Sequence, residues 1–119
     1  MQDVRKAFLM FEKVRVPILG IVENMSYFKC PDCQHRHFLF GENGGRELAE
    51  RFRVDLLSQV PLYTALREGG DRGTPIVISQ PESEVALIFR ELARKTAQKI
   101  SILAFQGVDP SQLIQVGKF

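Results

Sequence analysis

Two cysteines separated by two residues are the feature of this sequence that could do chemistry. They are Cys30 and Cys33, and the chain of 119 residues has no others. Two thiolates at this spacing can bind one metal ion or one edge of an iron–sulfur cluster, because the turn between them directs both sulfurs the same way. A tetrahedral zinc site or a cubane cluster takes four protein ligands, so further ligands must come from elsewhere.

Three completions of this site are possible. A two-fold symmetric dimer would bring two cysteine pairs together and supply four sulfurs. Alternatively, His35 and His37 share a face with Cys33 if this segment is extended, which would give a crowded zinc site of two cysteines and two histidines. In the third, the pair binds no metal and cycles between dithiol and disulfide. The spacing favours metal or cluster binding, and the histidines are interpreted more simply as solvated strand residues.

The residues around the cysteines predict a small hairpin over residues 27–40 with the cysteines at its tip. Aromatic residues flank the pair on both sides, with Tyr27 and Phe28 before it and Phe38 and Phe40 after it. Phe28, Phe38 and Phe40 would shield or brace the hairpin, or simply pack in it. A thioredoxin-like site instead places its first cysteine at a helix start, which this context does not match. The basic residues Lys29 and Arg36 would favour deprotonated thiols.

Apolar residues at helical spacing predict three helices that must position this hairpin. Asp3 can cap the first and Asn43 the second, while Ser79 begins a capping box for the third. The third helix is long and amphipathic, and we expect it to run to about Phe105. Glycines and a proline within residues 62–75 predict a short helical turn followed by a loop.

Two short apolar runs predict strands. Residues 16–22 do not alternate, which is typical of a strand buried on both faces of a parallel sheet, and they end in the polar residues 23–26. A second strand over residues 54–60 ends at Pro61. The order of helix, strand, hairpin, helix, strand and helix is an α/β pattern. So few strands are expected to be the closing half of a doubly wound domain.

Ligands of open α/β sheets bind at the carboxyl ends of the strands. Asn24 follows the first predicted strand, and its side-chain amide could suit the edge of a purine base, although a turn-forming asparagine is the simpler interpretation. The same two interpretations apply to Pro61 and Leu62, which end the second strand. Residues 41–45 lack the lysine and Ser/Thr of a phosphate loop, so we expect them to lead into a helix.

Composition argues against several classes of function. The net charge of +2, from 16 basic and 14 acidic residues, is too small to indicate a nucleic-acid or anionic-membrane partner. No apolar run reaches the roughly 20 residues of a membrane span, and the polar start has no secretory core. We therefore expect a cytoplasmic protein with reduced cysteines and without nucleic-acid or membrane partners.

Several strings together resemble the Mrp/ApbC group of P-loop ATPases, relatives of the MinD-like enzymes. The most specific is Gly-Ile-Val-Glu-Asn-Met-Ser at residues 20–26, followed by Cys-Pro-Asp-Cys at residues 30–33. Supporting strings are Asp-Val-Arg-Lys at 3–6, Phe-Gly at 40–41, Val-Pro-Leu at 60–62 and Gly-Asp-Arg-Gly-Thr-Pro at 70–75. The resemblance covers about residues 3–100, most of the chain.

The resemblance implies a dimeric ATPase that binds a 4Fe–4S cluster and passes it to apo iron–sulfur proteins. The cluster would lie between the subunits of a homodimer on paired Cys-x-x-Cys motifs, here Cys30 and Cys33. The asparagine of the Glu-Asn-Met-Ser string would contact the adenine of ATP, which is Asn24 here, with Pro61 and Leu62 at the same edge. This implication favours the dimeric completion of the cysteine site.

The resemblance also limits what this chain is expected to do alone. In the family, the Walker A loop, the catalytic aspartates and the switch regions precede the matched strings, and no Walker A sequence occurs here. We therefore expect a fragment or a shortened product. Residues 1–106 would form the C-terminal half of a doubly wound, mostly parallel P-loop NTPase domain, and residues 107–119 a flexible tail.

Two consequences concern function. ATP would bind only with the missing N-terminal half, and no catalytic residue is assigned in this chain. The alternative to a cluster carrier is a zinc-binding interaction module or a thiol redox protein without cluster transfer. His35 and His37 follow the second cysteine where the family often has other residues, which keeps zinc open as the bound metal.

Overall fold

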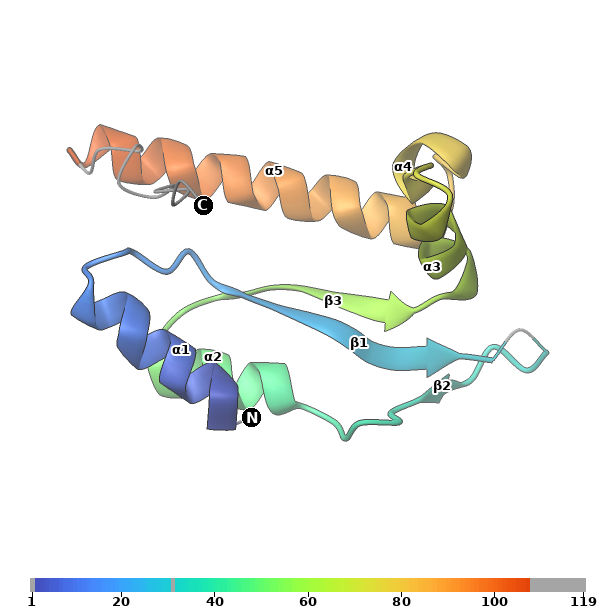
Figure 1. Cartoon of the computed structure of the whole chain (residues 1–119), viewed down its shortest axis with the longest axis horizontal. Coiled ribbons are helices and arrows are strands. Elements are labelled where there is room, and N and C mark those ends of the chain that lie inside the picture. The colour runs from blue at the N-terminus through green and yellow to red at the C-terminus, as the bar shows by residue number, and fades with distance from the viewer. Residues whose placement is uncertain (1, 31, 108–119) are drawn as a thin grey trace.

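The computed structural model describes residues 2–30 and 32–107 and builds them around a three-stranded sheet with the order β2-β1-β3 (Figure 1). The strands β1 (Ile21–Lys29) and β3 (Leu56–Leu62) are parallel. The short strand β2 (Arg36–His37) runs antiparallel to the end of β1 and forms the predicted hairpin with it. The α/β class is therefore confirmed.

Helices cover both faces of this sheet (Figure 1). The long helix α5 (Glu84–Phe105) lies along one face, while α1 (Gln2–Lys13) and α2 (Gly44–Phe52) lie on the other. The short helices α3 (Thr64–Asp71) and α4 (Ile76–Ser79) connect β3 to α5. Helices on both faces of a parallel strand pair are the arrangement of a doubly wound sheet, as predicted.

The first strand begins later than the predicted strand over residues 16–22. Its ladder starts where the N–H of Ile21 donates to the carbonyl of Asp55 at 2.8 Å. Pro17 has no N–H to donate to a ladder. At Gly20 the two strands approach so closely that a Cβ would lie 2.6 Å from the Asp55 carbonyl oxygen, which only glycine permits.

The polar residues 23–26 do not end β1, which corrects the prediction from the sequence. The register with β3 shifts between Asn24 and Phe28, and Met25 takes a left-handed backbone conformation with φ 54°. This irregularity is a β-bulge, and the strand continues beyond it. Nor does Pro61 end β3: it lies within that strand, which is tolerated because β3 is at the edge of the sheet.

Glu23 joins the bulge to β3 and α2. One oxygen of its carboxylate accepts hydrogen bonds from the Ser26 hydroxyl and the Gln59 amide, both at 2.7 Å. The other accepts the backbone N–H of Gly45 at 2.7 Å. Asn43 does occupy the N-cap position of α2, but its side chain makes no capping hydrogen bond. The prediction is therefore right about the position of Asn43 but wrong about its role, because the Glu23 carboxylate accepts a backbone N–H of the first turn instead.

The first helix packs through one aromatic residue. α1 begins at Gln2, so Asp3 lies in its first turn and does not cap it as predicted. Phe8 is buried and stacks on Phe52 of α2 with 4.1 Å between the ring centroids. Other apolar residues of the helix, including Leu9 at 61% exposed, face outward.

The long helix begins after a different cap from the one predicted. The hydroxyl of Ser83 accepts the N–H of Ala86 at 3.2 Å. Ser79 instead ends α4 and donates to the Pro75 carbonyl at 3.4 Å. The predicted end at Phe105 is confirmed.

Beyond this helix the structure describes the chain only as far as Gly107. The rest of the predicted flexible tail, residues 108–119, lies outside the described residues. Within the described part, no helix is both long enough and apolar enough to cross a membrane.

Candidate iron–sulfur site

Cys30 and Cys33 lie in the turn of the β1–β2 hairpin, as predicted (Figure 1). The N–H of Cys30 donates to the carbonyl of His35 at 2.9 Å, and the N–H of Gln34 donates to the carbonyl of Cys30 at 2.9 Å. Both cysteines are free thiols; Cys33 is exposed and Cys30 is half-buried. The hairpin therefore presents two free thiols at an accessible tip.

The turn itself lowers the pKa of the Cys30 thiol. The backbone N–H groups of Cys33 and Asp32 donate to its sulfur, the Cys33 side chain adds a further hydrogen bond, and together these outweigh the opposing effect of burial. The charges of Lys29 and Arg36, from which the sequence predicted this effect, pair with a carboxylate on α5 instead. Because the thiolate is the form that binds metal, the turn favours the liganding state of Cys30.

The two histidines do not join the cysteines. The rings of His35 and His37 contact each other edge to face with centroids 5.8 Å apart, and His37 lies against Phe28 at 6.5 Å. Within residues 2–30 and 32–107, no group of three or more His, Cys, Asp and Glu side chains is placed to hold a metal ion. The zinc site of two cysteines and two histidines is therefore not assembled in the described part of one chain.

The aromatic flanks divide between packing and exposure. Tyr27 is 5% exposed, its ring lies 6.4 Å from that of Phe38, and the guanidinium of Arg36 lies 4.5 Å above it. Phe40 is 73% exposed, so the prediction that it braces the hairpin is wrong. Tyr27 is the buried aromatic anchor of the hairpin.

Asn24 lies within β1 opposite Val60 and not after the end of the strand. Its side chain is exposed, and its Oδ1 accepts the N–H of Met25 at 2.9 Å. This hydrogen bond is local, but Asn24 lies inside a strand, so the simpler interpretation of a turn-forming asparagine is wrong. Regular parallel pairing of β1 with β3 is interrupted directly after Asn24, so Asn24 lies at the edge of this interruption.

Pro61 and Leu62 line a cavity of about 310 Å³ that Cys30 also lines. The other lining residues are Tyr27, Lys29, Gln34, Tyr63, Glu84 and Val85. This volume is at the lower end of the range for small-molecule pockets. Asn24 is not among the lining residues. Of the three predicted nucleotide contacts, Pro61 and Leu62 thus lie beside the cysteine turn. The third, Asn24, lies elsewhere on β1.

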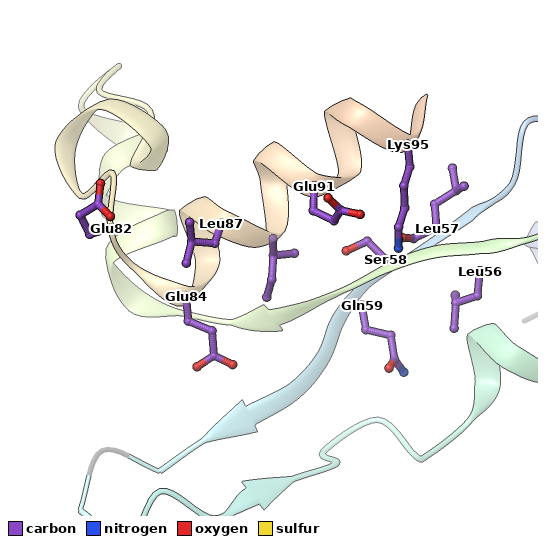
Figure 2. Close-up of a pocket in the computed structure, with 10 residues that line it drawn as sticks. Leu56, Leu57, Ser58, Gln59, Glu82, Glu84, Leu87, Glu91 and Lys95 are labelled. Atoms are coloured by element: carbon purple, nitrogen blue, oxygen red, sulfur yellow. The ribbon is translucent and has the colours of Figure 1, made fainter. Parts of the chain in front are cut away.

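A larger groove of about 770 Å³ lies between β3 and α5 (Figure 2). None of the predicted site residues lines it. Figure 2 shows the side chain of Lys95 reaching from α5 to β3, where its Nζ donates to the Leu57 carbonyl at 3.1 Å. A lysine in this position hinders the pairing of another strand with the outer edge of β3. Because none of the predicted site residues lines this groove, we place the candidate site at the cysteine turn.

Two glutamates that the sequence analysis did not single out hold this region in place. Glu23 organises the bulge beside Asn24, and Glu84 at the start of α5 accepts a hydrogen bond from Lys29 at 2.8 Å. The position of Glu23 in the Glu-Asn-Met-Ser string was a signal that could have drawn attention to it. Glu84 is 55 residues away from Lys29, and no local pattern signals that contact.

Comparison with known proteins supports the fold. A solved nucleotide-binding protein from Archaeoglobus fulgidus, in complex with ADP, matches with a TM-score of 0.56 and 37% identity, over 68% of this chain and 32% of that one. The family model described as ParA, NUBPL iron-transfer P-loop NTPase, matches residues 1–97. The fold is thus that of part of a P-loop NTPase, as predicted.

Curated relatives agree with this assignment. The "Iron-sulfur cluster carrier protein" of Salmonella typhimurium is 52% identical over 98 residues, which is 82% of this chain and 27% of the relative. The mouse "Iron-sulfur cluster transfer protein NUBPL" is 42% identical over 100 residues, 84% of this chain and 31% of the relative. This chain belongs to the family of NUBPL-type iron-transfer P-loop NTPases, which confirms the resemblance to the Mrp/ApbC group. It spans about a quarter to a third of the length of these relatives.

Proposed function

We propose that this chain binds an iron–sulfur cluster through Cys30 and Cys33 and passes it to recipient apo-proteins. The observation that carries the proposal is the pair of free thiols at an accessible hairpin tip, one of them with a lowered pKa. Iron in such clusters is held by cysteine thiolates. An exposed site also suits a carrier, because the cluster must be reached by the protein that receives it.

The proposal includes a homodimer and a 4Fe–4S cluster. Such a cluster takes four cysteine ligands, and this sequence contains two. A two-fold symmetric pair of chains would supply four sulfurs from two hairpin tips. Because Cys33 is exposed and the hairpin extends past the start of α5 (Figure 1), a second copy could approach the tip without rearrangement of the core.

The proposal assigns Asn24, Pro61 and Leu62 to the adenine of ATP in a protein that also contains the upstream half of the domain. The cavity supports this assignment for Pro61 and Leu62, and the ADP bound by the related Archaeoglobus fulgidus protein supports nucleotide binding in such a fold. Asn24 does not line the cavity, and its assignment rests on its place in the Glu-Asn-Met-Ser string. No Walker A sequence is present here, so ATP hydrolysis is not proposed for this chain alone.

A cytoplasmic location without nucleic-acid partners is also part of the proposal. Two free thiols suit a reducing compartment. The net charge of +2 offers little attraction for a polyanion.

A zinc-binding module or a thiol redox protein is the rival function. The lowered pKa of Cys30 is the observation that favours thiol chemistry. The position of the cysteines disfavours it, because they lie in a turn between antiparallel strands and not at the start of a helix.

Anaerobic reconstitution of the full chain with iron and sulfide tests the proposal against this rival. Cluster absorption in the wild type that is lost in the Cys30→Ser, Cys33→Ser double variant would support a carrier. The His35→Ala, His37→Ala double variant is the matched control and should keep the cluster. Stoichiometric zinc with no iron or sulfide in the reconstituted wild type would favour the rival.

A further inference from the structure

The carboxylate of Glu84 contacts both strands of the cysteine hairpin. Its Oε2 lies 2.8 Å from the ammonium of Lys29, and its Oε1 lies 3.8 Å from the guanidinium of Arg36. The hydroxyl of Tyr27 donates to the same Oε1 at 3.5 Å. Lys29 and Arg36 are paired across the hairpin immediately before the turn that carries the cysteines. Glu84 therefore acts on the base of that turn.

The backbone that carries Glu84 is itself held firmly. Glu84 is the first residue of a 22-residue helix whose N-terminus is capped by Ser83. The next two residues, Val85 and Ala86, are 3% and 0% exposed. Figure 2 shows the Glu84 side chain extending from this first turn of α5 toward β1. The contacts of Glu84 with Lys29 and Arg36 thus form a tether that connects the hairpin to the packed core.

The hairpin is short and mostly exposed beyond this point. Its second strand is two residues long, and residues 32–41 are exposed. A two-stranded hairpin alone is marginally stable in water. The Tyr27 ring anchors its base in the core, and backbone hydrogen bonds between Cys30, Gln34 and His35 shape the turn. The contacts of Glu84 therefore restrict how far the turn can swing.

We propose that Glu84 is a positioning residue that holds the Cys30–Cys33 turn in one orientation and so slows loss of the bound cluster. A cluster shared by two chains needs both turns to point at it together, so a turn that swings freely loses its ligand geometry more often. The part of this inference that concerns cluster loss depends on the proposed function. The part that concerns the orientation of the turn does not.

The test compares Glu84→Ala with Glu91→Ala, because the two glutamates are closely matched. Glu91 lies on the same helix, pairs with Arg94 at 2.7 Å and has 47% of its side chain exposed, against 46% for Glu84. Amide order parameters of Cys33 and Gln34 in the cluster-free chain measure the motion of the turn. The half-life of the reconstituted cluster in the presence of an iron chelator measures retention.

We expect Glu84→Ala to lower these two order parameters toward the flexible range, below about 0.6, and Glu91→Ala to leave them unchanged. We also expect the cluster half-life to shorten by up to about five-fold, the limit for an exposed ion pair. The double variant Lys29→Gln, Glu84→Ala should change both readouts little beyond Glu84→Ala alone, because the two substitutions break the same contact. Non-additivity of this kind separates a tether from a general loss of stability.

Equal order parameters in Glu84→Ala and Glu91→Ala would overturn the inference. So would effects of Lys29→Gln and Glu84→Ala that simply add in the double variant. If the wild-type chain takes up no cluster, the proposed function fails, while the order parameters of the cluster-free chain still decide whether Glu84 holds the turn. Should Glu84→Ala not fold, Lys29→Gln breaks the same 2.8 Å ion pair from the hairpin side and should lower the same order parameters.

Discussion

The carboxylate of Glu23 accepts the backbone N–H of Gly45 at 2.7 Å, which joins the bulged strand β1 to the first turn of α2. A carboxylate at a helix N-terminus satisfies an otherwise unpaired N–H and interacts favourably with the helix dipole. The two residues are also in close contact, since a Cβ at position 45 would lie 2.9 Å from the Cβ of Glu23. This contact sets the distance between the helix and the strand that leads to the cysteines.

Replacing Glu23 by alanine should destabilise the fold. Gly45, Gln59 and Ser26 would each lose the acceptor that they now share. Loss of a charged hydrogen-bond acceptor costs about 1.5–3 kcal/mol. Urea denaturation followed by circular dichroism would measure the change. The exposed Glu42→Ala variant is the control and should change stability by less than about 0.5 kcal/mol.

The same carboxylate should make stability depend on pH. Burial would raise the pKa of Glu23, but hydrogen bonds from Gln59, Ser26 and Gly45 outweigh it and lower the pKa below its ordinary value of 4.5. The folded state therefore binds fewer protons than the unfolded state. This contribution to stability is present above pH 4.5 and is lost as the pH falls through the folded pKa.

Urea titrations at pH values from 7 to 3 would check this dependence. The Glu23→Gln variant cannot ionise at this position, so its stability should decline less steeply below pH 4.5 than that of the wild type. Parallel curves for the two proteins would contradict the assigned role of Glu23.

The start of α5 can be tested with two serines. Ser83 caps the helix, so Ser83→Ala should reduce stability by about 0.5–2 kcal/mol. Ser79 was the predicted cap but ends α4, and Ser79→Ala should lie within about 0.5 kcal/mol of the wild type. Thermal or urea unfolding of the two variants would decide between them, and a larger loss at Ser79 would contradict the structure.

The features that were predictable from the sequence rest on local patterns. The spacing of Cys30 and Cys33 and their aromatic flanks indicated a hairpin tip, and the apolar periodicity of α5 indicated its end at Phe105. The α/β order of the elements also follows from local patterns.

The features that were missed depend on contacts between distant residues. Glu23 and Ser26 looked like the end of a strand because their polar groups had no visible partners, yet Gln59 and Gly45 satisfy them and the strand continues. Glu84 and Lys29 are 55 residues apart in the sequence, so no local pattern of residues could predict their contact.

Alkylation should reveal the lowered pKa of Cys30. In the Cys33→Ser variant only Cys30 reacts, and the serine keeps a hydroxyl that can donate to the Cys30 sulfur. The rate of reaction with iodoacetamide should reach half its maximum below pH 9.0, the ordinary thiol value, because backbone N–H groups stabilise the thiolate. The same protein in concentrated urea is the control, and identical profiles in both states would argue against this role of the turn.

In the proposed homodimer, two copies of this chain hold one cluster between their Cys30–Cys33 turns. Native mass spectrometry of the anaerobically reconstituted chain measures this directly. We expect a species with the mass of two chains plus one 4Fe–4S cluster, and we expect it to be absent from the Cys30→Ser, Cys33→Ser variant. A single chain that carries its own metal, or a cluster-loaded dimer that forms equally well without the two cysteines, would contradict it.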